Sequence, residues 1–136
     1  MGHVYGVDHS EEMWRQASRR NRKAIRAGGV SLQVCSVDDL EPLPELVDVV
    51  LAVNNVGTWP EPPTQIRRLR GFLRPGGRLA VVSQPRCPGA TASTTEDAAR
   101  KLEELLRAAG YVDVTCRTLA LSPPAACVVG TSPPHE

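Results

Sequence analysis

Blocks of apolar residues alternate along the chain with polar stretches, and their periods predict strands and helices in turn. Residues 47–53 read Val-Asp-Val-Val-Leu-Ala-Val, an almost unbroken apolar run that is typical of a strand buried on both faces of a parallel sheet. Over residues 11–27 apolar side chains recur at spacings of three, four and seven, which predicts an amphipathic helix that stops at Gly28 and Gly29. By the same criteria the predicted strands are 3–7, 30–37, 47–53, 78–83, 112–121 and 125–129, and the predicted helices are 11–27, 64–73 and 96–109.

The order of these elements predicts the fold class. Strands that alternate with helices favour an α/β fold with a three-layer, mostly parallel sheet and right-handed crossovers. The last two strands are separated only by Ser122, Pro123 and Pro124, and so short a connection requires an antiparallel pair. We therefore expect one domain over residues 1–130 that ends in a C-terminal antiparallel hairpin, followed by a disordered tail over residues 131–136.

Composition excludes several classes of protein. The chain has 136 residues, of which 41% are apolar and 23% charged, as in ordinary globular domains. A formal net charge of +1 argues against binding to nucleic acid or to anionic membranes by bulk electrostatics. No apolar run approaches the roughly 20 residues of a membrane span. Residues 1–8 lack the basic and apolar regions of a signal peptide, so we expect a cytoplasmic protein.

Metal and redox chemistry are not expected. Zinc and redox motifs place their ligands in close pairs, whereas the four cysteines are widely spread and form no C-x-x-C motif. The histidines are not clustered with carboxylates either. The cysteines are Cys35, Cys87, Cys116 and Cys127, and the histidines are His3, His9 and His135.

Five segments resemble, in the right order, the class I S-adenosylmethionine-dependent methyltransferases. They read Val-Tyr-Gly-Val-Asp-His-Ser-Glu-Glu-Met at 4–13, Cys-Ser-Val-Asp-Asp-Leu-Glu-Pro-Leu-Pro at 35–44, Val-Asp-Val-Val-Leu-Ala-Val-Asn-Asn-Val at 47–56 with Thr58-Trp59-Pro60 beyond it, Leu-Arg-Pro-Gly-Gly-Arg-Leu at 73–79 and Ala-Ala-Gly-Tyr-Val-Asp-Val at 108–114. Each segment is weak evidence alone, but together they cover nearly the whole chain. They are most similar to the small-molecule, type 11-like branch.

This resemblance implies a Rossmann-like methyltransferase fold, S-adenosylmethionine as cofactor and methyl transfer to a small-molecule acceptor. Asp8 would stand at the carboxyl end of a strand, where open α/β sheets bind ligands. Its carboxylate could accept hydrogen bonds from both ribose hydroxyls, or it could only assist the start of the next helix. Met13, on the first turn of that helix, would lie against the adenine, although core packing is an equal alternative.

The resemblance also implies contacts in two later loops. Ser36, Val37 and Asp38 occupy the stretch that reads the adenine edge. Members of the family often carry a carboxylate where Ser36 aligns, so Asp38 or Asp39 would have to replace it, unless these are simply solvated turn residues. A second set of residues follows the fourth family strand: Asn54 would lie near the methionine part of the cofactor, and Asn55 and Trp59 would line the acceptor pocket.

These three residues have structural alternatives. Asn54 and Asn55 are typical turn-forming residues, and Trp59 could equally cover the sheet. The sequence offers no convincing general base, so the catalytic residues stay unknown: His3 and His9 lie on the cofactor side, and Asn54 cannot take a proton. This suits an acceptor that is already acidic, or a base in the part of the family fold that is missing here. The basic run on the first helix is expected to be a solvated face; it comprises Arg15, Arg19, Arg20, Arg22, Lys23 and Arg26.

The family's glycine-rich loop has no counterpart in this sequence. No G-x-G cluster precedes Asp8, so the resemblance starts at the second strand of the family, truncated before that loop, with the first strand missing. In the family that strand lies between the second and the fourth. The two strands could pair directly, a second chain could fill the gap as a homodimer through the exposed central sheet edge, or the chain could be incomplete.

Three hypotheses about function remain open at this point. The first is an S-adenosylmethionine-dependent methyltransferase, in which the acceptor attacks the sulfonium methyl in line. The second is a non-catalytic fragment or scaffold that has lost cofactor binding, which the absent glycine-rich loop favours. The third is a dinucleotide-binding Rossmann domain, because an acidic strand end also suits the ribose of NAD. The terminal hairpin and the Asn54-Asn55 loop count against the third.

Overall fold

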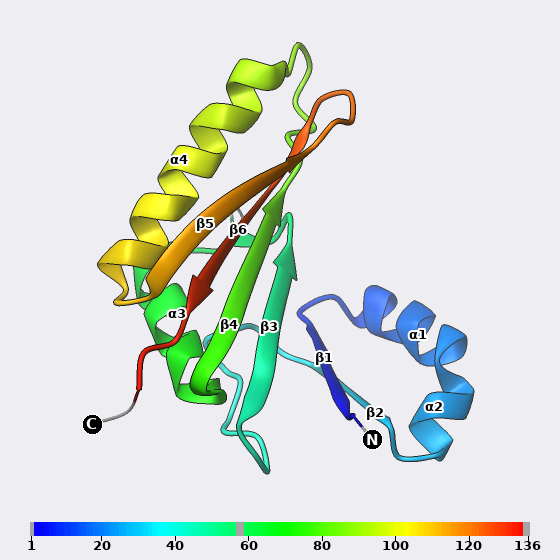
Figure 1. Cartoon of the computed structure of the whole chain (residues 1–136). Coiled ribbons are helices and arrows are strands. Elements are labelled where there is room, and N and C mark those ends of the chain that lie inside the picture. Colours follow the sequence, from blue (N-terminus) through cyan, green and yellow to red (C-terminus); the bar gives the residue numbers. More distant parts are fainter. Residues whose placement is uncertain (1, 57–58, 135–136) are drawn as a thin grey trace. The chain divides into compact units, whose positions relative to one another are not determined.

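Strand pairing divides the protein into two sheets. A computed structural model describes residues 2–56 and 59–134, whose contacts group into two compact units, Met1–Glu41 and Pro42–Glu136. The first unit holds a two-stranded sheet and the second a four-stranded sheet (Figure 1). The predicted α/β class is confirmed, whereas the single domain predicted over residues 1–130 stays a prediction.

Two parallel strands form the sheet of the first unit. β1 (Val4–Asp8) is followed by the helices α1 (Glu11–Arg20) and α2 (Arg22–Arg26), and β2 (Val30–Val34) returns parallel to β1. The register pairs Asp8 with Val34, so the carboxyl ends of both strands lie side by side. Ser10 starts α1, because its hydroxyl accepts a hydrogen bond from the backbone N–H of Met13 at 3.3 Å.

Two elements of the first unit are shorter than predicted. The helix predicted over residues 11–27 is interrupted at Asn21, whose side-chain Nδ2 donates to the carbonyl oxygen of Ala17 at 2.8 Å. An amide that binds the backbone in this way competes with the helix. The strand predicted over residues 30–37 ends at Val34, and a turn follows in which the N–H of Asp39 donates to the carbonyl oxygen of Ser36 at 3.2 Å.

The sheet of the second unit is mixed. Its strands β3 (Val47–Val53), β4 (Leu73–Ser83), β5 (Val112–Leu119) and β6 (Ala125–Thr131) lie in the order β3-β4-β6-β5. β3 is parallel to β4, and β6 is antiparallel to both β4 and β5. The predicted C-terminal antiparallel hairpin is therefore confirmed.

Helices of the second unit cover one face of this sheet. α3 (Pro62–Leu69) continues into the short 3-10 helix η2 (Arg70–Phe72), and α4 (Ala92–Ala108) lies along β5 and β6 (Figure 1). α4 starts four residues before the predicted position, because Thr94 Oγ1 accepts a hydrogen bond from the N–H of Thr91 at 3.1 Å. The main core lies between these elements and comprises Ile66, Leu69, Phe72, Leu73, Leu79, Val81, Leu102, Leu106, Tyr111 and Val128.

The prediction that residues 47–53 are buried on both faces is wrong. Val49, Leu51 and Val53 are 50%, 64% and 48% exposed, although the strand has the predicted bounds. The register aligns Leu51 with Ala80 and Val53 with Val82, whereas α4 packs on the face that carries Leu79 and Val81. The exposed side chains of β3 therefore belong to the face opposite α4.

The ordered chain also continues beyond the predicted boundary at residue 130. Thr131 belongs to β6, and the backbone of Ser132 donates to the carbonyl oxygen of Gly77 at 2.7 Å. The carbonyl oxygen of Ser132 in turn accepts from the N–H of Gly76 at 3.0 Å. A disordered tail that starts at residue 131 is therefore wrong for residues 131 and 132, and residues 135 and 136 lie outside the described residues.

Candidate functional site

Asp8 lies at the carboxyl end of β1, as predicted. Its Oδ1 atom accepts a hydrogen bond from the N–H of Ser10 at 2.8 Å, and its carbonyl oxygen accepts one from the N–H of Cys35 at 3.0 Å. The side chain is 42% exposed, and Oδ2 has no hydrogen-bond partner among the residues that the structure describes. Asp8 thus assists the start of α1, and it still presents one carboxylate oxygen to a ligand.

Met13 is a surface residue of α1. Its side chain is 51% exposed, so packing in a hydrophobic core does not account for it. It lies on the first turn of α1, three residues after the cap residue Ser10. A thioether exposed here is available for contact with a flat apolar ligand.

The loop after β2 is tied to the carboxyl end of β1. The bond between Cys35 N–H and the carbonyl oxygen of Asp8 brings this loop beside Asp8. Ser36 Oγ donates to Asp39 Oδ2 at 3.0 Å and accepts from the N–H of Asp39 at 3.3 Å. The structure thus gives Asp39 a local structural role. Val37 is half-buried and Asp38 is exposed in the same turn.

Asn54 follows β3 in a left-handed backbone conformation, with φ +54°. Asparagine tolerates this conformation better than most residues, which supports the turn-forming interpretation. Its backbone N–H donates to the carbonyl oxygen of Val82 at 2.8 Å, and its Oδ1 accepts from the N–H of Gln84 at 2.8 Å. Gln84 Nε2 donates to the carbonyl oxygen of Pro123 at 2.9 Å. These bonds tie the carboxyl ends of β3 and β4 to the β5–β6 hairpin.

The residues predicted to line the acceptor pocket follow Asn54. Val56 is only 6% exposed and anchors this loop in the core. The N–H of Trp59 donates to the carbonyl oxygen of Val56 at 3.2 Å, and its side chain is half-buried. Asn55 is exposed. Thr58, which the resemblance included, lies outside the described residues.

The predicted site residues fall into two groups. Asp8, Met13 and the loop with Ser36, Val37 and Asp38 lie together at one end of the first unit, and Asn54, Asn55 and Trp59 lie together after β3 in the second. Sequence reasoning missed Gln84. The only signal for it is a polar residue directly after a predicted apolar strand, which does not reveal its partners.

The titratable groups with shifted pKa values lie elsewhere in the second unit. Burial raises the pKa of Tyr111, whose hydroxyl donates to the carbonyl oxygen of Ile66 at 3.0 Å. Burial, with further contributions from Glu103 and Cys127, raises the pKa of the Cys116 thiol. Both groups therefore stay protonated at neutral pH, and neither is a nucleophile activated by a lowered pKa.

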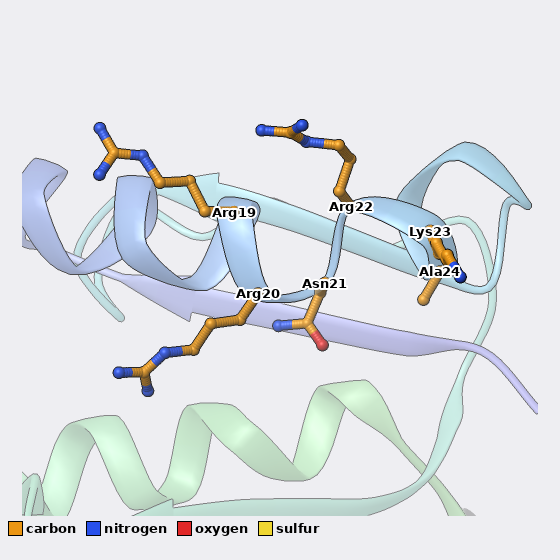
Figure 2. A pocket seen from close by; sticks show the side chains of 6 residues that line it. All are labelled: Arg19, Arg20, Asn21, Arg22, Lys23 and Ala24. Carbon is orange, nitrogen blue, oxygen red and sulfur yellow. The ribbon is translucent and has the colours of Figure 1, made fainter.

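Two surface hollows are formed by residues outside the predicted site. One is lined by consecutive residues at the junction of α1 and α2, where Figure 2 shows Arg19 and Arg22 extending to one side and Arg20 and Asn21 to the other. Side chains that diverge in this way do not converge on a ligand. The other lies between α4 and β5, with Thr95, Glu103, Cys116 and Thr118 in its lining.

The described part of the chain holds neither a cluster of metal-ligating side chains nor a helix that could span a membrane. Residues 2–56 and 59–134 contain no group of three His, Cys, Asp or Glu side chains placed to hold a metal ion. Among these same residues, no helix has the length and apolar composition needed to cross a membrane.

Comparison with known sequences gives two matches. The family model described as a methyltransferase domain, of the type 11 group, matches residues 1–81. The chain is also 32% identical over 122 residues to a protein of Bacillus subtilis (strain 168) named as the uncharacterized methyltransferase YdaC. That alignment covers 89% of this chain and 65% of the relative, so the chain spans about two thirds of the relative's length.

Solved structures with similar folds include methyltransferases and one cyclase. A methyltransferase dependent on S-adenosylmethionine from Aquifex aeolicus superposes with a TM-score of 0.73 at 18% identity, over 96% of this chain and 69% of that one. The methyltransferase SibL gives 0.73 at 20% identity, over 96% of this chain and 43% of that one. The [4+2]-cyclase SpnF gives 0.76 at 16% identity, over 98% and 67% of the two chains.

Proposed function

Because the chain belongs to the class I methyltransferase domains of the type 11 branch, we propose that its protein transfers a methyl group from S-adenosylmethionine to a small-molecule acceptor. S-adenosylmethionine is the cofactor of this family. The observation that carries the proposal is Asp8, an exposed carboxylate held at the carboxyl end of a parallel strand. That is the position at which open α/β sheets bind the sugar of a nucleotide-like ligand.

The residues of the first unit fit the adenosine part of this cofactor. Asp8 keeps one carboxylate oxygen for a ribose hydroxyl while the other holds Ser10. Met13 supplies an exposed apolar surface for a flat ring. Val37 and Asp38 supply backbone and carboxylate groups for the adenine edge, with Ser36 keeping the turn in place through Asp39.

In the second unit, Asn54, Asn55 and Trp59 are proposed to serve the methionine part of the cofactor and the acceptor. When bound, the cofactor would supply a methyl group on its sulfonium: the acceptor oxygen, nitrogen or carbon would bond to this methyl as the sulfur–methyl bond breaks, and S-adenosylhomocysteine would leave with the electron pair. The protein's own contribution is to position the acceptor and to exclude water, so an acidic acceptor requires no further catalytic residue. Trp59, half-buried beside the anchored Val56, supplies an apolar wall for a small organic molecule.

The test is isothermal titration of the chain with S-adenosylhomocysteine, with Asp8→Asn as the variant. This substitution keeps an oxygen to accept from Ser10 N–H and removes the charge that favours the ribose hydroxyls, so we expect about tenfold weaker binding. Asp97→Asn is the matched control, because Asp97 is an exposed carboxylate that pairs with Arg100 on the surface of α4. No binding to the folded wild-type chain would contradict the proposal.

The second candidate is a non-catalytic scaffold with the same fold. Its support is that Asp8 Oδ1 and Asn54 Oδ1 both accept hydrogen bonds from backbone N–H groups, so both side chains already have a structural role. The similarity to a cyclase also fits the rule that one fold hosts several functions. The titration separates the candidates, because a scaffold of this kind does not bind S-adenosylhomocysteine.

The binding partners of the protein are also part of the proposal. A net charge of +1 supports a small-molecule acceptor rather than nucleic acid or an anionic membrane as partner. β3 is an edge strand of its sheet and carries exposed apolar side chains, which supports a homodimer that pairs through this edge.

A further inference from the structure

The end of α1 and the whole of α2 carry a dense group of positive charges. Five exposed basic side chains make up this basic cluster: Arg19, Arg20, Arg22, Lys23 and Arg26. None of them forms an ion pair with a residue that the structure describes, whereas Arg15 pairs with Glu11 at 2.9 Å and with Glu12 at 3.9 Å. The basic cluster is therefore a patch of uncompensated charge on the first unit.

The acidic residues of the first unit lie apart from this cluster. No Asp or Glu occurs between Glu12 and Asp38 in the sequence. Asp8 ends β1 and Asp38 stands in the turn after β2, so both belong to the carboxyl ends of these parallel strands. α2 instead leads to Gly29, whose carbonyl oxygen accepts from the N–H of Val4 at 3.0 Å, at the amino ends of the strands. The basic cluster thus extends away from the Asp8 site.

The arrangement of the basic cluster is electrostatically unfavourable in the free chain. Arg22 and Arg26 are four residues apart in α2, and like charges at this spacing on a helix repel one another. Arg19 and Arg22 extend to the same side (Figure 2). No acidic residue occurs in the first turn of α2 to offset these charges. Binding of an anionic partner would relieve this repulsion.

The directions of the side chains indicate which kind of anion fits. Arg19 and Arg22 extend to one side of the helices and Arg20 to the other, so they do not converge on one small anion (Figure 2). Residues 19–26 span about 12 Å at the helical rise of about 1.5 Å per residue. Guanidinium groups pair with carboxylates through two parallel hydrogen bonds. A short patch that is rich in arginine therefore fits several separate carboxylates on an acidic protein surface.

A long polyanion fits the charge of the molecule less well. The net charge of the chain is +1 and the basic cluster contributes +5, so the rest of the chain has a net charge of 1 − 5 = −4. Nucleic acid carries a continuous row of phosphates that extends well beyond a patch of this size. The net negative remainder of the chain would repel it there, whereas the acidic surface of a protein can end where the patch ends.

We propose that the basic cluster of α1 and α2 is a docking surface for the acidic surface of another protein. The proposal is independent of methyl transfer, because the cluster extends away from Asp8 and docking there leaves the Asp8 carboxylate accessible. Added salt should weaken the association strongly, since it screens exposed charges beyond about 8 Å already at physiological ionic strength.

The first test is the stability of the free chain, measured as Tm. Lys23→Glu places a carboxylate three residues before Arg26 and four residues after Arg19, with little change in helix propensity. We expect Tm to rise by about 1–3 °C at low salt and the gain to shrink at high salt. Lys101→Glu, four residues after Asp97 in α4, is the matched control and should bring no gain. No rise for Lys23→Glu would overturn the proposal, because the cluster would then be an ordinary solvated face.

The second test is the binding of anionic probes, measured by fluorescence anisotropy with the whole chain. The probes are a labelled peptide of alternating Glu and Gly, the same peptide with Gln in place of Glu, and a single-stranded oligonucleotide of equal charge. We expect the Glu peptide to bind more tightly than the other two, and the double variant Arg19→Glu/Arg22→Glu to bind it about tenfold more weakly than the wild type.

The matched control reverses two exposed arginines of the second unit, Arg78→Glu/Arg117→Glu, neither of which forms an ion pair within residues 2–56 and 59–134. A loss confined to the Arg19/Arg22 variant supports the docking surface. An equal loss in the control, or no binding of the Glu peptide, overturns the proposal. Tighter binding of the oligonucleotide overturns it in favour of nucleic acid. S-adenosylhomocysteine should bind the wild type and the Arg19/Arg22 variant equally, so failure here leaves the proposed methyl transfer standing.

Discussion

At the scale of single residues, Tyr111 joins the end of α4 to α3. Its hydroxyl donates to the carbonyl oxygen of Ile66 at 3.0 Å, and the side chain is 3% exposed. Burial raises the pKa of Tyr111, and the nearby Arg70 guanidinium offsets only part of this effect. The phenol must therefore stay protonated in the folded protein, while in the unfolded chain it ionises near its ordinary pKa of about 10.

Replacing Tyr111 by Phe tests this hydrogen bond and its pH dependence. We expect the free energy of unfolding at pH 7 to fall by about 1–2 kcal/mol, because the carbonyl of Ile66 loses its buried partner. In the wild type the native state holds the phenolic proton more tightly than the unfolded state, so stability should be lost as the pH rises above about 10. Urea unfolding from pH 7 to 11 measures both effects. Equal pH dependence in the two proteins would contradict this account.

Residue positions in the site were predictable, and their partners were not. The apolar runs that end at Asp8 and Asn54 mark the carboxyl ends of strands, so the sequence places both residues correctly. The bond from Gln84 to Asn54 joins residues 30 positions apart. It depends on the register of β3 against β4, which no local pattern specifies.

At the scale of elements, the end of α4 is built around Gly110. This residue has φ +92°, and a Cβ atom added to it would meet the guanidinium of Arg70. Arg70 Nη1 donates to the carbonyl oxygen of Ala109 at 3.0 Å. The same side chain thus provides a hydrogen-bond donor for a carbonyl group at the end of α4, where the helix itself has none. An alanine at 110 would therefore be strained in its backbone and would also displace the Arg70 guanidinium from the carbonyl oxygen of Ala109.

Gly110→Ala should therefore lower the free energy of unfolding more than the same substitution at another glycine with a positive φ. Gly76 is the matched control, since it has φ +81° and no atom within 4 Å of an added Cβ. We expect Gly76→Ala to lower the free energy of unfolding by about 1 kcal/mol and Gly110→Ala by at least about 2 kcal/mol. Denaturant titration of both variants compares them. A loss of the same size in both would show that the Arg70 contact does not matter.

Periodicity predicted which elements exist better than where they end. β3 is an exception: its predicted bounds are the observed ones, because polar residues stand on both sides of the apolar run. The interruption at Asn21 was missed, because its cause is a bond from a side chain to the carbonyl oxygen of Ala17 rather than a change in the apolar pattern. The exposure of Leu51 was missed because it depends on which face α4 covers.

At the scale of the whole molecule, each sheet has an edge strand that pairs in parallel with its neighbour. β1 pairs with β2 in the first unit, and β3 is an edge strand in the second. The exposed side chains of Val49, Leu51 and Val53 add an apolar surface to that edge. Exposed edges of this kind are prone to pair with another chain.

The homodimer proposal predicts self-association that depends on Leu51. We expect the wild-type chain to elute as a dimer in size-exclusion chromatography with light scattering at tens of micromolar. Leu51→Lys should give a monomer, because it places a charge on the exposed apolar surface. Leu119→Lys is a suitable control, since Leu119 is 62% exposed on β5 at the opposite edge of the sheet. A wild-type monomer at this concentration would refute the proposal.

The central claim is that the carboxyl end of β1 holds the ribose of S-adenosylmethionine. A crystal structure of the chain grown with saturating S-adenosylhomocysteine tests it most directly. Our account predicts the ribose hydroxyls within hydrogen-bonding distance of the Asp8 carboxylate, with the bond from Ser10 N–H to Oδ1 kept. Crystals without the ligand at this position, or with the ligand bound away from Asp8, would contradict it.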